Sequence, residues 1–323
     1  MLYKDKKLGK YQIICYLGTG GFGSVYLAND VLLKRKVALK IPHYQDKANQ
    51  QEMLSEPRIM AALRHPNIVE LITVEKGEDI FFMVMEYVDG ESLDKLIRRN
   101  QMLPPVKAVD IAIDVCMAMD FYHVNQVVHQ DLRPSNILIT KSGVAKITDF
   151  GTSQILKLQN DKLGNNKVDP KLCITTEHFR DREIFQSDIW SLGVVLYEML
   201  TGIMPLCKNN TINITKLIQN NQIIPPHIRQ ATVPKNISDI VMKILTTNIG
   251  DRYTSAKELL KDLRTIRGHM SHGGKIAMID TALAKSNYSK NNNTIIKERL
   301  CRFCYRPMPR LAVHCPICGE INQ

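Results

Sequence analysis

The stretch His129-Gln130-Asp131-Leu132-Arg133-Pro134-Ser135-Asn136, followed by the apolar run Ile137-Leu138-Ile139, decides the fold of this 323-residue chain. Asp131 can accept the proton of a hydroxyl group, and Asn136, five residues later, can reach a magnesium ion. Downstream, Asp149-Phe150-Gly151 adds a carboxylate, the hard oxygen ligand that Mg²⁺ or Mn²⁺ prefers. Taken singly, each of these motifs could be no more than an aspartate in a turn or an asparagine in a loop. Their order and spacing together indicate metal-assisted phosphoryl transfer.

A glycine-rich turn near the start of the chain offers a place for phosphate groups. It runs Gly18-Thr19-Gly20-Gly21-Phe22-Gly23 and continues into Ser24-Val25. Glycines let the backbone approach phosphate oxygens closely and direct N–H groups at them. Such a turn alone is weak evidence, because most are ordinary hairpins. A β-rich run follows where a dinucleotide-binding fold would begin a helix, which argues against that fold.

Lys40 ends the strand-like run Val37-Ala38-Leu39-Lys40. A lysine here can neutralise the α- and β-phosphates of ATP if a carboxylate holds it in place. Glu56, on a helix predicted over residues 52–63, is the best candidate for that carboxylate, and Glu52, one turn earlier, is the reserve. Without such a partner, a lysine on a strand is an ordinary solvated side chain.

The hydrophobic pattern changes along the chain from strands to helices. Short β-rich runs are predicted at residues 11–17, 24–28, 36–41, 68–75 and 80–86, and helices at 52–63, 106–123, 189–200 and 237–245. A strand-heavy small lobe followed by a helical large lobe is an α+β arrangement. No run of about 18 apolar residues occurs, and residues 1–10 lack the apolar region of a secretory signal. We therefore expect a cytoplasmic protein.

Taken together, the four motifs resemble the eukaryotic-type (Hanks-type) protein kinase family over residues 11–263. Further matches are MVMEYV at residues 83–88 as a hinge strand, SDIWSLG at 187–193 as a large-lobe helix, and Asp251-Arg252 near the end of the domain. The stretches HPNIV (65–69) and YEMLTG (197–202) look most like bacterial Ser/Thr kinases. The resemblance implies a two-lobed protein kinase fold, ATP and Mg²⁺ as cofactors, and transfer of the γ-phosphate to Ser or Thr hydroxyls of proteins.

The resemblance also assigns roles to individual residues. The catalytic set would be Lys40, Glu56, Asp131, Arg133, Asn136 and Asp149, with Asn136 and Asp149 as magnesium ligands. The nucleotide would contact Gly18, Gly20, Gly21, Gly23, Val25, Ala38, Lys40, Met85, Glu86, Val88 and Leu138. In that set the backbone of Glu86 and Val88 would bind adenine beside the gatekeeper Met85. Leu71, Met60, Phe150 and His129 would stack between the lobes, with Asp188 anchoring His129.

Two departures from the family pattern concern regulation. Gln130 stands where many kinases have an arginine that pairs with a phosphate on the activation loop, and glutamine cannot form that charge-assisted pair. Between residues 154 and 174 there is no Ser, Thr or Tyr. Both observations favour activity that needs no activation-loop phosphorylation.

Two other departures concern the acceptor. Arg133 replaces the lysine usual in Ser/Thr kinases; it can still bind the γ-phosphate, but some tyrosine kinases have arginine there, so the hydroxyl preference is less certain. Thr175-Thr176-Glu177 stands where the family has Ala-Pro-Glu, and Asp169-Pro170 where it has Gly-Thr. Glu177 could still pair with Arg252, but the geometry of peptide binding is in doubt.

Four of the eight cysteines fall within the last 23 residues, as Cys301-Arg302-Phe303-Cys304 and Cys315-Pro316-Ile317-Cys318. Two C-x-x-C pairs can close a tetrahedral Cys₄ shell around a structural Zn²⁺ with no position left for water. The Cys-Pro-x-Cys-Gly knuckle resembles zinc ribbons. Disulfides or a redox dithiol are the alternative.

We therefore expect a kinase domain at residues 9–265, a basic polar linker at 266–298 and a zinc ribbon at 299–323. From residue 265 onward nine Lys/Arg face three Asp/Glu, which gives +6 of the net charge of +11. Such a tail can attract an acidic protein or nucleic acid, or can be a solvated linker. Besides an active kinase, the altered acceptor segment leaves two alternatives: a pseudokinase scaffold that recruits a partner through the ribbon, and a kinase-fold enzyme that acts on a small molecule.

Overall fold

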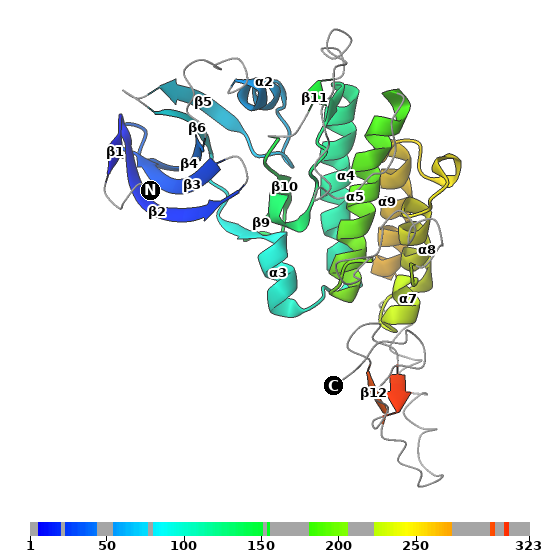
Figure 1. Ribbon diagram of the computed structural model, residues 1–323. Coiled ribbons are helices and arrows are strands. Elements are labelled where there is room, and N and C mark those ends of the chain that lie inside the picture. Colours follow the sequence, from blue (N-terminus) through cyan, green and yellow to red (C-terminus); the bar gives the residue numbers. More distant parts are fainter. Residues whose placement is uncertain are drawn as a thin grey trace.

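The computed structural model describes residues 6–20, 23–43, 54–76, 80–150, 154–155, 181–205, 223–272, 298–300 and 307–309 (Figure 1). The small lobe contains β1 (Lys7–Leu8), β2 (Tyr11–Thr19), β3 (Gly23–Asp30), β4 (Arg35–Pro42), α2 (Ser55–Ala62), β5 (Leu71–Lys76) and β6 (Phe81–Glu86). Its strands form one antiparallel six-stranded sheet in the order β1-β2-β3-β4-β6-β5.

The large lobe is mainly helical. Its helices are α3 (Leu93–Asn100), α4 (Pro105–Val124), α5 (Asp181–Thr201), α7 (Pro226–Arg229), α8 (Lys235–Ile244) and α9 (Ala256–His272), with 3₁₀ turns η2 (Pro134–Asn136) and η4 (Ile249–Asp251). Its short strands are β7 (Gly90–Ser92), β8 (Val127–Val128), β9 (Ile137–Thr140), β10 (Ala145–Ile147) and β11 (Gln154–Ile155). Helices α4, α5 and α9 lie side by side, and β9 and β10 lie between them and the small lobe (Figure 1). The predicted two-lobed α+β fold is confirmed for these residues.

Alternate side chains of β4 point to opposite faces of the small-lobe sheet. Val37 and Leu39 pack with Tyr11 and Phe82 in a core of the small lobe itself. The intervening Ala38 belongs to the core cluster that extends into the large lobe. Because successive side chains of a strand point to opposite faces, Lys40 lies on the same face as Ala38. That face is the one turned toward the candidate site.

A second connection besides the hinge joins the lobes. The Asn67 side chain donates to the carbonyl of Ala145 (2.8 Å), and backbone bonds link Asn67 and Val69 to Ile147 (2.8 Å each). Ile68 forms an isolated parallel bridge with Ile147. The strand predicted at residues 68–75 therefore begins only at Leu71, because residues 67–69 pair with Ile147 of β10, while the carbonyl of Glu70 accepts the N–H of Glu86 in β6 (2.9 Å). The sequence pattern could not distinguish these two partners.

The structure differs from the predicted helices in further places. Helices α3, α7 and α9 were not predicted individually, and α5 begins at Asp181 instead of residue 189. Helix α9 continues to His272, so residues 266–272 of the predicted linker are helical. Among the described residues, no helix is long and apolar enough to cross a membrane. The strands β12 (Glu298–Leu300) and β13 (Pro307–Pro309) pair antiparallel near the C-terminus. The four predicted zinc ligands, Cys301, Cys304, Cys315 and Cys318, lie outside the described residues.

Gly193 permits the close approach of α5 to α8. A Cβ placed there would lie 2.4 Å from Ile244 Cγ2 and 3.0 Å from Leu245 Cδ2. Gly193→Ala is expected to lower the free energy of unfolding by about 1–3 kcal/mol, because both side chains must move in a packed core. Gly268→Ala on α9 is the control: outside its own helix backbone, no atom of the described part of the chain lies within 4 Å of its added Cβ, so it should be neutral or stabilising by up to about 1 kcal/mol. Urea denaturation of the two variants measures both values, and equal effects would contradict this role of Gly193.

Candidate active site

The loop from His129 to Asn136 is fixed by bonds of its own backbone and by Asp188 of α5. Asp188 is fully buried and accepts the N–H groups of His129 and Gln130, both at 2.9 Å. It also contacts Nε2 of His123 at 3.1 Å. Burial acts to raise the pKa of Asp188, but the bond and charge interaction with His123 and the bond from the His129 N–H hold it below its ordinary value. The predicted anchoring of His129 by Asp188 is confirmed.

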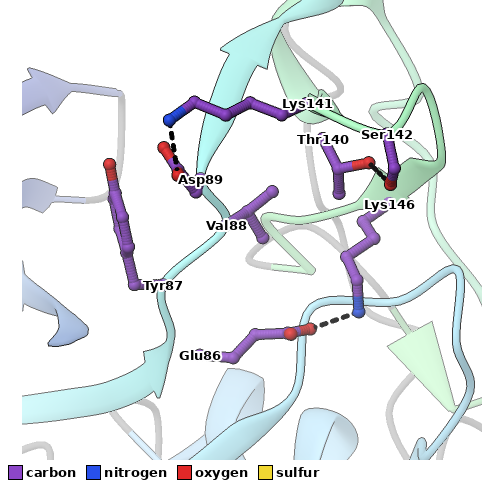
Figure 2. A pocket seen from close by; sticks show the side chains of 8 residues that line it. All are labelled: Glu86, Tyr87, Val88, Asp89, Thr140, Lys141, Ser142 and Lys146. Carbon is purple, nitrogen blue, oxygen red and sulfur yellow. Dashed lines mark hydrogen bonds and ion pairs between the residues drawn. The ribbon is translucent and has the colours of Figure 1, made fainter. Parts of the chain in front are cut away.

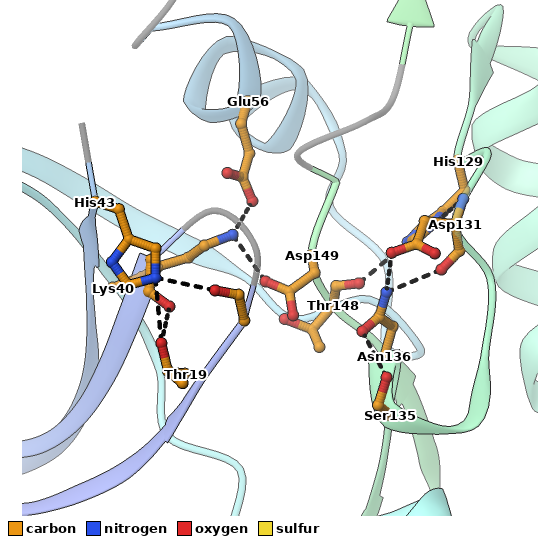
Figure 3. Close-up of polar contacts among 12 residues, drawn as sticks. Thr19, Lys40, His43, Glu56, His129, Asp131, Ser135, Asn136, Thr148 and Asp149 are labelled. Atoms are coloured by element: carbon orange, nitrogen blue, oxygen red, sulfur yellow. Dashed lines mark hydrogen bonds and ion pairs between the residues drawn. The ribbon is translucent and has the colours of Figure 1, made fainter. Parts of the chain in front are cut away.

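His129 joins this loop to the segment that carries Asp149 (Figure 3). Its Nδ1 accepts the N–H of Asp131 (3.2 Å), so the remaining ring proton is on Nε2, which donates to the carbonyl of Thr148 (3.0 Å). The ring of His129 also lies 4.6 Å from that of Phe150, and both side chains are fully buried. Since Thr148 and Phe150 flank Asp149, one histidine fixes both sides of that residue.

Asp131 and Asn136 lie in direct contact. Nδ2 of Asn136 donates to the carbonyl oxygen of Asp131 (2.9 Å) and to its Oδ2 (3.0 Å), while Oδ1 of Asn136 accepts from Ser135 (3.1 Å). Nε of Arg133 lies 3.5 Å from Oδ2 of Asp131, and half of the arginine side chain is exposed. A carboxylate whose side chain is 13% exposed thus lies beside a half-exposed cation, the arrangement expected for binding a hydroxyl group next to a phosphate.

The ion pair predicted for Lys40 is present, and Glu56 is its partner on α2. Nζ of Lys40 lies 2.6 Å from Oε1 of Glu56 and 2.7 Å from Oδ1 of Asp149 (Figure 3). The lysine side chain is only 3% exposed. Burial acts to lower the pKa of Lys40, but Asp149 and Glu56 together raise it above its ordinary value, so the amine stays charged at neutral pH. Glu52, the reserve choice, lies outside the described residues.

The glycines of the glycine-rich turn, residues 18–23, have different structural roles. A Cβ at Gly23 would meet the carbonyl oxygen of Ile41 at 2.5 Å, so the β3–β4 pairing itself requires glycine there. Apart from the adjacent residues in the chain, no atom of the described residues lies within 4 Å of an added Cβ at Gly18 or Gly20, so packing among them does not explain those two glycines. Open space beside a glycine backbone is what the close approach of a phosphate needs. Gly21 lies outside the described residues.

His43, just after β4, was missed at the sequence level. Its Nε2 lies 3.0 Å from the carbonyl of Gly20 and 3.2 Å from Oγ1 of Thr19, which in turn donates to the carbonyl of Gly23 (3.3 Å) (Figure 3). The histidine thus connects the glycine-rich turn to the strand that bears Lys40. A histidine three residues beyond a strand lysine carries no recognisable pattern.

Apolar side chains predicted to enclose a purine come together between the lobes. Ala38 and Met85 are buried in the large core cluster, and Val25 and Leu138 pack against its edge half-buried. The Glu86 side chain turns aside and bonds Lys146 at 2.7 Å. Both residues line an open pocket at the hinge (Figure 2), where Lys141 also bonds Asp89 (2.7 Å). The volume of this pocket is about 320 Å³.

The donor set fits a nucleotide with its metal. Asn136 and Asp149 offer amide and carboxylate oxygens. Among the described residues, no three His, Cys, Asp or Glu side chains are grouped so that they could hold a metal ion. A magnesium ion held by one or two protein oxygens takes the rest of its shell from water and phosphates. Gly151, Asp169, Pro170, residues 175–177 and most of the activation loop lie outside the described residues.

Comparison with known proteins agrees with this geometry. The sequence model of the protein kinase domain family matches residues 11–263 of this chain. The chain is 34% identical over 272 residues to the serine/threonine-protein kinase PrkC of Bacillus subtilis, and 33% identical over 263 residues to a probable serine/threonine-protein kinase of Clostridium perfringens. It is 32% identical over 269 residues to PknB of Mycobacterium leprae. These alignments cover 80–82% of the chain but only 38–43% of the relatives' length.

Asp188→Asn should weaken the whole loop, because an amide offers one acceptor oxygen where the carboxylate uses two. We expect the free energy of unfolding to fall by about 2–4 kcal/mol and phosphotransfer to fall with it. Asp110→Asn is the matched control: it removes the partner of Arg267 at a half-exposed ion pair and should cost less than about 1 kcal/mol. Thermal and urea unfolding compare the two, and a cost at position 188 no larger than at 110 would contradict the anchoring role.

Proposed function

The chain belongs to the protein kinase family, and we propose that it is an ATP-dependent serine/threonine protein kinase. The observation that carries the proposal is the contact of one buried lysine with two carboxylates, Lys40 with Glu56 and Asp149, beside the Asp131–Asn136 pair. Each of these residues has a defined part in phosphoryl transfer. The names of the relatives support serine and threonine as acceptors.

The proposed mechanism uses positioning and charge. Lys40, held by Glu56, binds the α- and β-phosphates, and Gly18 and Gly20 leave the backbone free to approach them. Asp131 accepts the proton of the substrate hydroxyl, and Arg133 binds the γ-phosphate as negative charge develops. Asn136 and Asp149 would hold Mg²⁺ (or Mn²⁺), which when bound neutralises charge on the phosphates. Adenine would contact Val25, Ala38, Met85, Leu138 and the backbone of Glu86 and Val88.

We further propose that activity does not depend on phosphorylation of the activation loop. Gln130 replaces a phosphate-binding arginine, and residues 155–173 contain no hydroxyl side chain. The bonds from Asp188 to the N–H groups of His129 and Gln130 order the catalytic loop from inside the large lobe. An external phosphate is therefore not needed to hold it.

Labelled ATP with Mg²⁺ tests these proposals on the purified chain. Wild type should label itself or a generic protein on Ser or Thr, and Asp131→Asn and Asp149→Ala should lower the rate by about a hundredfold or more. Treatment with phosphatase beforehand should leave the rate unchanged. The control Asp239→Asn removes a surface partner of Lys235 and should be silent.

ATP binding without any transfer would support the alternative, a pseudokinase scaffold. Transfer to a small molecule but not to protein would support the other alternative, a kinase-fold enzyme that acts on a small molecule. Loss of activity after phosphatase treatment, traced to the activation loop, would refute independence from phosphorylation.

We also propose three regions in a cytoplasmic protein: the kinase domain at residues 9–265, a basic linker at 266–298 and a zinc ribbon at 299–323. The first seven residues of that linker, 266–272, continue helix α9. Cys301 and Cys304 lie in sequence between β12 and β13, which pair antiparallel. A hairpin that brackets a C-x-x-C pair is how a zinc knuckle is built, and so few residues need a metal to fold. The ribbon and the basic tail would serve an acidic protein or nucleic-acid partner.

Zinc analysis of the reduced chain tests the ribbon. One Zn²⁺ per chain is expected, and Cys315→Ser should release it or weaken binding by about a hundredfold or more. Cys15→Ser is the control, since Cys15 is an exposed cysteine of the small lobe, and it should retain the metal. Absence of zinc in a chain with all eight cysteines reduced would contradict the proposal.

A further inference from the structure

His43 stands at the point where the chain continues from β4 past the start of β3. The register of the two strands pairs Gly23, the first residue of β3, with Pro42, the last residue of β4. His43 comes next and therefore lies beyond the paired end of β3. Because β3 lies between β2 and β4 in the sheet, a contact from His43 to the end of β2 spans two strand spacings, about 10 Å.

The side chain of His43 makes such a contact (Figure 3). Its Nε2 lies 3.0 Å from the carbonyl oxygen of Gly20 and 3.2 Å from Oγ1 of Thr19, the last residue of β2. A carbonyl oxygen only accepts, so Nε2 carries a proton and donates to Gly20. The side chain can make this bond only while the glycine-rich turn leans over the start of β3 toward β4. His43 thus holds the turn near the strand that bears Lys40.

Two further bonds set the shape of the turn itself. The N–H of Gly20 donates to the carbonyl of Gly23 (2.9 Å), and the hydroxyl of Thr19 donates to the same oxygen (3.3 Å). Both bonds join residues of the turn or of its end strands, so they do not fix its position relative to β4. Glycine has the greatest backbone freedom of any residue. The bond from His43 comes from a different strand and therefore limits where this glycine-rich segment can lie.

We propose that His43 is a positioning residue for the phosphates of ATP. Its Nε2–H holds the glycine-rich turn over the triphosphate, and the imidazole itself touches no phosphate atom. Lys40, three residues earlier on β4, binds the α- and β-phosphates in the proposed mechanism, so one strand fixes both phosphate-binding elements. A turn that is already placed loses less conformational entropy when the nucleotide binds. The inference rests on the proposed nucleotide site and names a residue that sets its affinity.

Direct contact between a charged imidazolium and the γ-phosphate is the competing role for His43. The geometry favours positioning, because Nε2 is already directed at two atoms of the turn. Both the neutral ring and the imidazolium offer an N–H group at this atom. Positioning therefore needs a donor of the right length, whereas direct contact with a phosphate needs the positive charge. Glutamine, whose side-chain amide reaches about as far as Nε2 of histidine and is never charged, distinguishes the two roles.

Titration of the full chain with the non-hydrolysable analogue adenylyl imidodiphosphate and Mg²⁺ tests the proposal. His43→Ala should weaken binding about three- to tenfold, which corresponds to the loss of one hydrogen bond. His43→Gln should restore the affinity to within about twofold of wild type, because it keeps the donor without a charge. Adenosine, which has no phosphates, should bind wild type and both variants alike. His269→Ala, at an exposed histidine of α9, is the matched control and should bind both ligands like wild type.

Steady-state kinetics with labelled ATP separate this role from the proposed activity. His43→Ala should raise the KM for ATP by the same factor and leave kcat nearly unchanged, because the turn contacts the phosphates in the ground state and the transition state alike. A wild-type chain that binds the analogue but transfers no phosphate would refute the proposed kinase activity. The loss of affinity in His43→Ala would then still support the positioning role.

Any of four results would overturn the inference. Equal affinity of wild type and His43→Ala for the analogue would show that this bond does not position the turn. An equal loss for adenosine and the analogue would place the effect in the whole site, and thermal unfolding would identify a fold defect. Failure of His43→Gln to restore affinity would show that the charged ring contacts a phosphate itself. Absence of analogue binding by wild type would refute the nucleotide site and this inference together.

Discussion

A buried cation that must be paired holds this structure together at its centre. Lys40 has almost no contact with water, so its charge is tolerable only because two carboxylates lie within hydrogen-bonding distance. Those carboxylates come from helix α2 and from the segment after β10, one in each lobe. Any conformation that separates α2 from β4, or Asp149 from both, leaves an unpaired charge in a region of low dielectric. The relative position of three elements is thus set by one amine.

The connection through β10 makes this arrangement cooperative. The backbone of residues 67–69 pairs with Ile147, and the N–H of Thr148 donates to the carbonyl of Asn136 (3.0 Å). His129 then bonds the carbonyl of Thr148 and packs on Phe150. The small lobe, the metal-binding segment and the catalytic loop are therefore linked within a few residues. Movement at any one of them strains bonds at the other two.

Much of the site could be predicted from sequence, because phosphoryl transfer restricts both residue type and spacing. Lys40, Glu56 and Asp188 were assigned to partners that the structure bears out, since a buried charge has few possible partners on neighbouring elements. The strand start at Leu71 and the role of His43 could not be predicted. An apolar run such as Ile68-Val69 suits either of two sheet partners, and a hydrogen bond from a loop histidine depends on tertiary placement alone. The cysteine-rich end stays a prediction.

The catalytic loop, residues 129–136, is ordered by bonds to the interior of the large lobe. Gln130 and Asp149 both have positive φ values, 64° and 63°, which non-glycine residues adopt only at a cost of roughly 1 kcal/mol or more. The N–H of Gln130 donates to Asp188, and Asp149 contacts Lys40, so each unfavourable backbone is held by a strong bond to a charged group. A glutamine at position 130 contributes its backbone N–H to this scheme. An arginine at the same position would offer the same N–H group, so this bond orders the loop independently of which of the two residues stands there.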